Sequence, residues 1–406
     1  MNTLLHNYNT RPTSTIPILK AHEVKTVPSS SYRPSLKVLG LGGGGSNAIN
    51  RMIELGLSGV DFIAANTDAQ ALNNCLAPTK IQLGPKYTRG LGAGGDPEVG
   101  QAAAEESWRA LADCLNGSDM VFLTAGMGGG TGTGSIPVAA KIAQSLGAVT
   151  IAIVTMPFSF EVGKRQKNAN DGLQRLRPHT DTLISIPNDR LLYIAPRDLP
   201  LETSFRLADD VLRQAVQGIT ELITQPGVIN VDFANVRHLM KMGGGALMSI
   251  GQGEGENKAI KAIEQALRHP LLESASIDNA TGILVNFTCG GSLTLFEVEA
   301  ALMHLQEQTG QKAEVVLGVV NDERMEDRVE AILIITGIGS PTLEETFSRV
   351  TQVRHPISQP SSPDPGEESE SPQAQPTIVA QAEAEYELLT SDVTNLDIPA
   401  FLRRRR

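Results

Sequence analysis

The chain has 406 residues, 41% of them hydrophobic, which is enough for two domains with buried cores. Its formal net charge of −11 argues against a nucleic-acid-binding protein, because such proteins normally carry a basic surface. The three cysteines are too scattered for a metal site or a disulfide framework, and no apolar run approaches the roughly 20 residues of a membrane-spanning helix. The totals therefore predict a soluble cytoplasmic protein.

Residues 1–34 are polar, rich in Ser, Thr and Pro, and without hydrophobic periodicity. Glu23 is the one acidic residue among them, and a lack of acids is typical of organelle targeting peptides. Basic residues are also sparse, however, and no amphipathic face is visible. We predict a disordered N-terminal arm, with a removable targeting peptide as the alternative.

From residue 36 onward, short β-rich runs alternate with helical runs, as in βαβ units around a parallel sheet. The runs at 36–42, 60–66, 120–126 and 149–155 are typical of strands, and those at 48–57 and 138–147 of helices. The fold class expected for residues 35–201 is therefore α/β, a Rossmann-like domain with a parallel sheet.

The first glycine-rich turn of this domain reads "VLGLGGGGSNA". Gly40, Gly42 and Gly45 match G-x-G-x-x-G, the dinucleotide-binding fingerprint. That fingerprint also requires an acidic residue at the end of the next strand, where this chain has Asn66, with Asp68 just beyond. A dinucleotide-dependent oxidoreductase therefore remains only an alternative, supported by the three glycines alone.

Two further glycine-rich loops follow, "TRGLGAGGDPE" at 88–98 and "AGMGGGTGTGS" at 125–135. The second lies between a strand-like and a helix-like run, so it is a turn inside a domain rather than a linker. Such a turn brings backbone N–H groups and a helix N-terminus to an anion. No G-x-x-x-x-G-K-[ST] sequence occurs, so a phosphate site here would depend on backbone donors, helix dipoles and a metal ion.

A long helix is predicted over 202–224, where Leu207, Val211, Leu212, Ala215 and Ile219 share one face. It ends at a Pro-Gly pair and leads into a loop that reaches residue 232. Helical and strand-like runs alternate again over 233–340, which predicts a second, smaller α/β domain.

The composition changes once more beyond residue 340. Residues 341–390 are rich in Pro, Ser and Glu and form a predicted disordered linker, which reaches roughly 40 Å as a random coil. Residues 391–406 return to apolar side chains followed by four arginines, "NLDIPAFLRRRR". We predict a docking peptide that also favours an anionic membrane surface, with a solvated basic terminus as the alternative.

Taken together, these stretches resemble the tubulin/FtsZ family. "GGGTGTG" at 128–134 is its signature, and "LGLGGGGSNAINRM", "FIAANTDAQAL", "IQLGPKYTRGLGAGGDPEVGQAAAEES" and "NVDFANVR" extend the resemblance over about residues 36–340. The resemblance implies a GTPase domain, a central helix with a catalytic loop (202–232) and a second domain. It also implies head-to-tail assembly into filaments at the midcell division site.

The same resemblance implies GTP or GDP with Mg²⁺ as cofactors. It implies further copies of the chain and membrane-tethering division proteins as partners, the latter bound by the C-terminal peptide. Neither nucleic acid nor a membrane span is expected.

The resemblance also implies a set of nucleotide-binding residues. Asn188 and Asp210 would recognise guanine, with Phe205 stacked on it, because a carboxylate accepts hydrogen bonds from both N1–H and the exocyclic amine. The alternatives are a core position for Phe205 and an ordinary turn at Asn188. Glu161 and Arg165 would contact the sugar and phosphate side. The remaining expected residues are Gly42, Gly43, Gly44, Gly45, Ser46, Asn47, Asn66, Asp68, Ala93, Gly94, Gly128, Gly129, Gly130, Thr131, Gly132, Thr133 and Gly134.

One departure from the family pattern concerns catalysis. The family loop after the central helix reads N-x-D-x-x-D and completes the nucleotide site of the next subunit. Here Asn230 and Asp232 match, but Asn235 stands at the second acidic position. An amide orients water but takes no proton, and loss of a general base typically slows a reaction about 10²- to 10⁴-fold. We therefore predict slow GTP hydrolysis and long-lived filaments, the alternative being a GTP-dependent structural polymer with little or no hydrolysis.

A second, milder departure is Gly95-Asp96, where family members commonly have Ala-Asn. We expect little effect from it, although Asp96 brings negative charge close to the phosphates.

Overall fold

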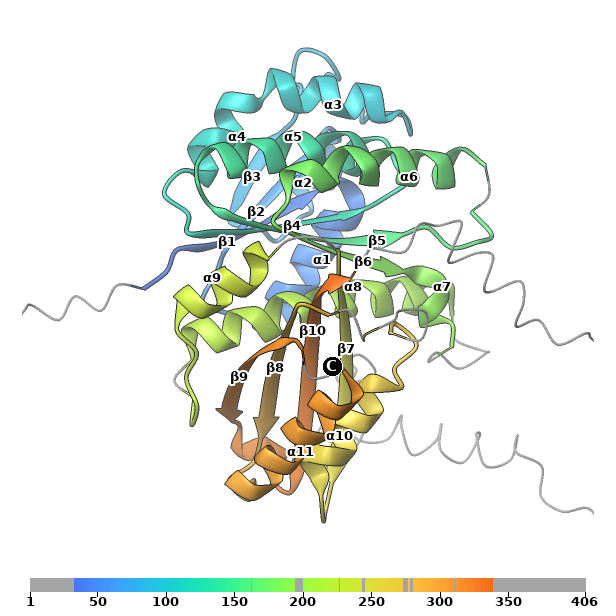
Figure 1. The fold of residues 1–406 in the computed structure, drawn as a ribbon. Coiled ribbons are helices and arrows are strands. Elements are labelled where there is room, and N and C mark those ends of the chain that lie inside the picture. The colour runs from blue at the N-terminus through green and yellow to red at the C-terminus, as the bar shows by residue number, and fades with distance from the viewer. Residues whose placement is uncertain are drawn as a thin grey trace, which may run out of the picture. The chain divides into compact units, whose positions relative to one another are not determined.

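The described part of the chain contains a ten-stranded sheet of order β3-β2-β1-β4-β5-β6-β7-β10-β8-β9, with helices on both faces (Figure 1). The computed structural model describes residues 33–161, 163–193, 200–225, 227–242, 245–272, 277, 280–309 and 312–338. The predicted N-terminal arm up to residue 32, the linker at 341–390 and the docking peptide at 391–406 lie outside these residues.

The first six strands of the sheet are all parallel, so the predicted Rossmann-like domain is confirmed. They are β1 (Leu36–Leu41), β2 (Asp61–Asn66), β3 (Thr79–Gln82), β4 (Met120–Gly126), β5 (Val149–Met156) and β6 (Thr182–Pro187). The strand order reverses between β1 and β4, and ligands of such sheets bind at this point, outside the carboxyl ends of the strands.

Helices cover both faces of this parallel sheet. One face packs against α1 (Gly42–Glu54), α2 (Ala69–Asn73) and α8 (Leu201–Thr224), and the other against α3 (Pro97–Glu106), α4 (Trp108–Leu115), α5 (Thr131–Ser145) and α6 (Lys164–Leu176). Two short helices, η1 (Arg177–His179) and α7 (Asn188–Leu191), flank β6. The predicted apolar face of α8 is confirmed, since Leu207, Val211, Leu212, Ala215 and Ile219 are all buried.

The second segment continues the same sheet with mixed strand directions. β7 (Gly245–Glu254) is parallel to β6 at Leu183 and Ile184, while β10 (Arg328–Ile338) is antiparallel to both β7 and β8 (Gly282–Cys289). β9 (Glu314–Asn321) pairs in parallel with β8 at the edge. The helices here are α9 (Phe233–Lys241), α10 (Lys258–Leu267), η3 (Glu323–Met325) and α11 (Leu295–Gln308), and the predicted smaller α/β domain is confirmed.

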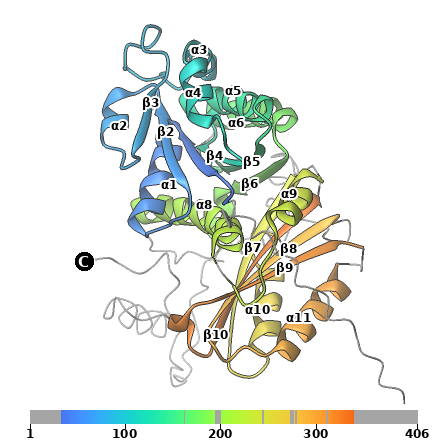
Figure 2. The same cartoon turned by 90° about the vertical axis from the view of Figure 1, so that its left-hand side faces the viewer.

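The central helix α8 lies between the two halves of the sheet (Figure 2). Its apolar residues share one buried cluster with α1, with strands of the parallel half and with Leu284, Ile332 and Ile334 of the second half. α10 and α11 form a separate cluster on the opposite face of β7–β10. α8 is therefore the structural link between the glycine-rich turns and the second segment.

Among the described residues, no helix combines the length and the apolar character needed to cross a bilayer. Cys75, Cys114 and Cys289 are all free thiols.

Candidate functional site

The glycine-rich turns at 38–48 and 125–135 touch each other at the carboxyl ends of β1 and β4. Gly42 has a φ of +69°, and a Cβ there would lie 2.8 Å from the nitrogen of Gly132. A Cβ on Gly44 would lie 2.9 Å from the nitrogen of Gly126. Only glycine allows two backbones to approach this closely. We call the surface that the main chain of the turns at 38–48 and 125–135 forms the cradle, and it is the predicted phosphate site.

The helices that leave these two turns begin without side-chain caps. The N-cap residues are Leu41 for α1 and Gly130 for α5, and neither helix has an acidic residue in its first turn. By contrast, α2 and α3 are capped by the carboxylates of Asp68 and Asp96. The first N–H groups of a helix need partners, so the uncapped ends of α1 and α5 fit an anionic ligand.

Space for such a ligand exists on both turns. A Cβ added at Gly43 or Gly129 would meet no atom within 4 Å, and the same holds for Gly94 in the loop at 88–98. The N–H groups of both uncapped helices therefore border open space. Phosphate oxygens fit this arrangement, because they accept hydrogen bonds without needing side-chain donors.

The glycine-rich loop at 88–98 packs against the turn at 125–135. A Cβ on Gly130 would lie 2.7 Å from the nitrogen of Asp96 and 2.9 Å from the Cβ of buried Ala93. Asn168 of α6 ties the two together, since its Nδ2 donates to the carbonyl oxygens of Gly95 at 3.2 Å and Gly128 at 3.4 Å. Sequence reasoning missed Asn168, because a single amide on a polar helix carries no signal of its own.

Several residues expected to bind nucleotide hold the loops in shape. The Thr133 hydroxyl accepts from the Gly128 N–H at 2.8 Å, and the Thr131 hydroxyl lies 2.5 Å from that of Thr67. The Asn66 side-chain oxygen accepts from the N–H of the residue two positions on, at 3.2 Å. Other expected residues of the first turn are the buried Ser46, whose hydroxyl has no partner among the described residues, and the exposed Asn47.

An aromatic cluster stands beside the predicted sugar contacts. Glu161 accepts a hydrogen bond from Arg165 and another from the N–H of Phe158 at 3.0 Å. The Phe158 ring stacks on Phe160 with centroids 5.0 Å apart and meets Phe205 edge-on at 5.6 Å. Phe205 is 41% exposed rather than part of the core, so part of its side chain is accessible to a ligand.

Asn188 follows β6 directly, as the first residue of α7. It is 6% exposed, and its side-chain oxygen has no hydrogen-bond partner among the described residues. A buried acceptor without a donor costs about 1–3 kcal/mol, so a ligand N–H would remove this cost. The ligand contact predicted for Asn188 stays a prediction, and this oxygen is the atom that would make it.

The two neighbouring carboxylates on α8 have different surroundings. Asp210, the predicted guanine contact, is fully buried and accepts from Arg213 Nε at 2.8 Å, with Arg51 Nε of α1 at 3.8 Å. Asp209 is partly exposed and lies one helical turn after Phe205, hence on the same face. Burial raises the pKa of Asp209 to about 7, while the charge of Arg51 opposes this shift.

The role predicted for Asp210 stays a prediction, and Asp209 joins the candidate site. Sequence reasoning overlooked it, although its four-residue spacing from Phe205 is a readable signal.

The predicted catalytic loop lies beyond the other end of α8. Asn230 accepts from the Gly227 N–H at 2.7 Å, and Asp232 is the N-cap of α9. Asn235, in the first turn of α9, donates its backbone N–H to the Asp232 carbonyl at 2.9 Å, and the Asn230, Asp232 and Asn235 side chains are all exposed. The structure brings these three together, but not with the glycine cradle.

No group of three or more His, Cys, Asp or Glu side chains that could hold a metal ion occurs among the described residues. A divalent ion here would therefore depend mainly on oxygens of the bound ligand, as is usual for Mg²⁺ with phosphates.

Comparisons with known families match this arrangement along most of the described chain. The family model "Tubulin/FtsZ family, GTPase domain" matches residues 35–196, and the model "FtsZ family, C-terminal domain" matches residues 244–339.

Solved structures give the same result. An empty FtsZ dimer from M. jannaschii is 45% identical, with a TM-score of 0.72, over 76% of this chain and 89% of that one. A mutant of FtsZ from M. jannaschii gives the same identity and TM-score over 75% and 92%. CetZ2 from Haloferax volcanii, a GTPγS-bound protofilament, is 20% identical with a TM-score of 0.67 over 78% and 98%, a likeness of fold alone.

Proposed function

This chain belongs to the tubulin/FtsZ family, within it to FtsZ, and we propose that it forms the head-to-tail filaments of the midcell division ring and hydrolyses GTP slowly at each junction. As a member of this family it is a GTPase that binds GTP and GDP.

One observation carries the proposal: the cradle and the catalytic loop lie at opposite ends of α8. That helix has 24 residues and is therefore about 36 Å long. The loop of one copy cannot reach its own cradle, whereas the loop of a second copy stacked head to tail meets it. The 45% identical relative is a dimer, which supports self-association.

In the proposed complex, the uncapped N-termini of α1 and α5 hold the phosphates. Arg165 and Glu161 contact the sugar side, and Phe205 stacks on the base. We assign the carboxylate that accepts from guanine N1–H and the exocyclic amine to Asp209, with the unpartnered oxygen of Asn188 accepting beside it. Asp210 then holds α8 to α1 through Arg51.

We further propose that Mg²⁺ accompanies the nucleotide, bound mainly by phosphate oxygens. When bound, the ion neutralises charge that develops on the phosphates. Asp68 and Asp96 are the nearby carboxylates in the sequence, but each already caps a helix, so neither serves as a dedicated ligand.

The slow rate follows from the catalytic loop. The Asp232 carboxylate is exposed and makes no capping hydrogen bond, so it is free to orient or polarise the attacking water. Asn235 shares its helix face three residues on, but an amide supplies neither a proton acceptor nor negative charge. In this chain Asp232 is therefore the one carboxylate at a loop where the family pattern has two.

The test is the variant Asn235→Asp. We expect its steady-state phosphate release, measured on assembled protein with GTP and Mg²⁺, to exceed that of the wild type by about 10²-fold or more, within the span that general bases contribute. Binding of a fluorescent GTP analogue should be unchanged, because Asn235 is remote from the cradle of its own copy.

Equal rates for the two proteins would contradict the slow-turnover proposal. Assembly of the wild type without any phosphate release would favour the alternative, a structural polymer that uses GTP only as an assembly ligand.

We also propose that residues 391–406 bind a membrane-tethering division protein, because their apolar residues and four arginines suit a partner groove near an anionic surface. A chain that ends at residue 390 should assemble with GTP but should not sediment with vesicles carrying the tether. Retained sedimentation would disprove this role.

A further inference from the structure

The loop at 88–98 contains an exposed turn with two hydrogen-bond donors that the fold leaves unused. The Asp96 N–H closes this turn by donating to the Ala93 carbonyl oxygen at 3.0 Å. The two central residues, Gly94 and Gly95, are exposed and have φ values of +57° and +74°. Neither N–H group bonds to another described residue, and a Cβ at either position would meet no atom within 4 Å. Both donors are therefore available to a ligand.

One side chain holds this turn in place. Asn168 of α6 donates through Nδ2 to the Gly95 carbonyl oxygen at 3.2 Å, and the same nitrogen donates to the Gly128 carbonyl oxygen at 3.4 Å. An amide NH₂ group has two hydrogens, so it can make both bonds at once. Within the described part of the chain, no other side chain forms a hydrogen bond with Gly94 or Gly95. The orientation of the turn relative to the cradle thus depends on Asn168.

The helix that carries Asn168 is fixed on both sides of this contact. A Cβ on Gly128 would lie 2.9 Å from the Arg165 carbonyl oxygen, so the start of α6 lies directly on the turn at 125–135. Further along α6, Arg175 Nη1 donates to Gln101 Oε1 of α3 at 3.2 Å, and α3 begins where the loop at 88–98 ends. The backbone at Asn168 therefore has a set position relative to the loop.

The position of the loop along the sheet indicates which part of a nucleotide it meets. The parallel strands stand in the order β3-β2-β1-β4-β5-β6, and Asn188, the proposed base contact, follows β6. The cradle lies at the ends of β1 and β4. The loop is attached beyond it, at the end of β2, where the Gly92 N–H donates to the Thr67 carbonyl oxygen at 3.3 Å. A nucleotide with its base near β6 and its phosphates on the cradle thus directs its last phosphate toward this loop.

We propose that Asn168 is a positioning residue that makes the nucleotide site prefer a triphosphate over a diphosphate. Asn168 holds the N–H groups of Gly94 and Gly95 where the terminal phosphate of GTP accepts hydrogen bonds from them, whereas GDP has no phosphate at this place. Without the Asn168 contact, the ligand itself must order the glycine turn, and the cost of that ordering reduces the affinity for GTP alone. This inference rests on the proposed placement of the phosphates on the cradle.

The experiment compares the full-length wild type with Asn168→Leu, which keeps the branched shape of the side chain but removes its donor. A fluorescent GTP analogue is displaced by unlabelled GTP or GDP with Mg²⁺, at protein concentrations too low for assembly. Each lost hydrogen bond weakens binding by about two- to tenfold. We therefore expect the variant to bind GTP at least fivefold more weakly than the wild type and to bind GDP within twofold of it.

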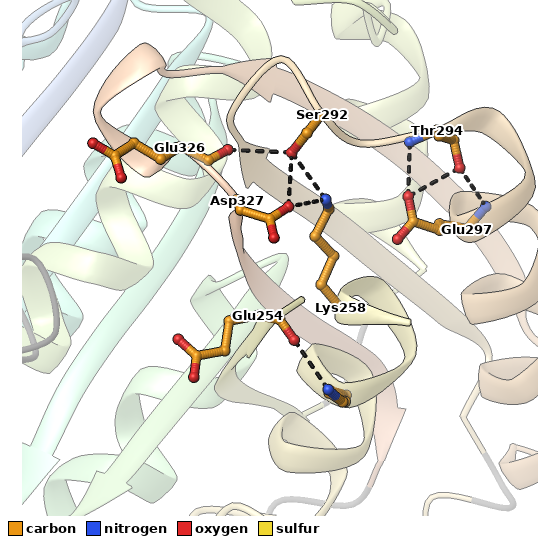
Figure 3. Close-up of polar contacts among 8 residues, drawn as sticks. Glu254, Lys258, Ser292, Thr294, Glu297, Glu326 and Asp327 are labelled. Carbon is orange, nitrogen blue, oxygen red and sulfur yellow. Dashed lines mark hydrogen bonds and ion pairs between the residues drawn. The ribbon is translucent and has the colours of Figure 1, made fainter. Parts of the chain in front are cut away.

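Two control variants test whether this effect is specific to Asn168. Asn170→Leu changes the same kind of side chain on the same helix, about 200° around the helix axis from Asn168. Ser292→Ala removes a contact between loops in the second segment, where the Ser292 hydroxyl lies 2.9 Å from Lys258 Nζ and 3.1 Å from Asp327 Oδ1 (Figure 3). Both controls should keep the wild-type ratio of the GDP and GTP dissociation constants.

An unchanged ratio in Asn168→Leu would overturn the inference, and so would an equal loss of affinity for GDP and GTP, which would indicate a general structural role. A comparable change of the ratio in either control would also overturn it. If Asn168→Leu does not fold, Asn168→Ala removes the same donor and is measured in its place. Failure of the wild type to bind GTP would instead refute the proposed function, so the two failures are distinct.

Discussion

Asp209 and Asp210 are adjacent in the sequence, but the helical period turns their side chains about 100° apart. Asp210 is directed into the interface of α8 and α1, where Arg213 and Arg51 surround its carboxylate. Asp209 shares the face of Phe205, and Arg51 supplies the main opposing charge to its burial. A buried ion pair of the first kind orients a helix, whereas a carboxylate with a raised pKa is suited to a ligand that donates hydrogen bonds.

The charge state of Asp209 leads to a prediction about pH. Burial raises the pKa of Asp209 to about 7, and only its ionised form accepts both guanine N–H donors. Affinity for GTP should therefore be constant above pH 7 and fall about tenfold per unit as the pH drops below it. Titration with a fluorescent GTP analogue from pH 8 to pH 5.5 measures this slope.

Two comparisons make this prediction specific. Asp209→Asn should bind GTP weakly at every pH and lose most of the slope, whereas Glu202→Gln, an exposed change on the same helix, should keep it. In the nucleotide-free protein the raised pKa acts in the opposite sense. The folded chain binds more protons than the unfolded chain between about pH 4 and pH 7, so its free energy of unfolding should fall as the pH rises through that window. In the GTP titration, an unchanged pH slope of affinity in Asp209→Asn would exclude Asp209 as the guanine contact.

At the scale of elements, the sequence predicts those helices and strands whose own hydrophobic period and residue preferences agree with the conformation they adopt. The central helix was expected at 202–224 and is observed at Leu201–Thr224, because its apolar period is long and uninterrupted. β7 was not expected, since "GALMSIGQGE" contains three glycines, which disfavour strands. Its strand conformation comes from pairing with β10 along nearly its whole length, a contact between distant parts of the chain that no local pattern reveals.

The residues of the candidate site also fall into those that a local sequence pattern predicts and those that depend on contacts between distant segments. The glycine-rich turns were predictable, because glycine at a strand-to-helix turn has a direct physical meaning. The role of Asn168 was not predictable, because it depends on α6 crossing the loop at 88–98, which brings the Asn168 amide to Gly95 and Gly128. The roles of Asp209 and Asp210 likewise became distinguishable only once Arg51 was placed beside α8.

At the scale of the whole molecule, α8 keeps apart two sets of groups that the proposed hydrolysis at a two-copy junction would need together. The cradle is the proposed phosphate site and offers backbone groups, while the Asp232 carboxylate is exposed beyond the far end of the helix. Separation of this kind links chemistry to assembly, because nucleotide on a free monomer has no catalytic group within reach. Heterologous contacts of this type also propagate into filaments rather than closed dimers.

Two inactive variants should therefore restore each other's activity when mixed. In Gly130→Val the added Cβ would lie 2.7 Å from the Asp96 nitrogen, which disrupts the cradle but leaves the catalytic loop intact. Asp232→Ala keeps the cradle and removes the loop carboxylate. Each variant alone should release little phosphate, while an equal mixture should recover up to about a quarter of the wild-type rate, because about a quarter of random junctions combine an intact cradle with an intact loop. A mixture of Gly130→Val with Gly42→Val, both defective in the cradle, should stay inactive. If the first mixture is no more active than its components, the site lies within a single copy and the two-copy junction is wrong.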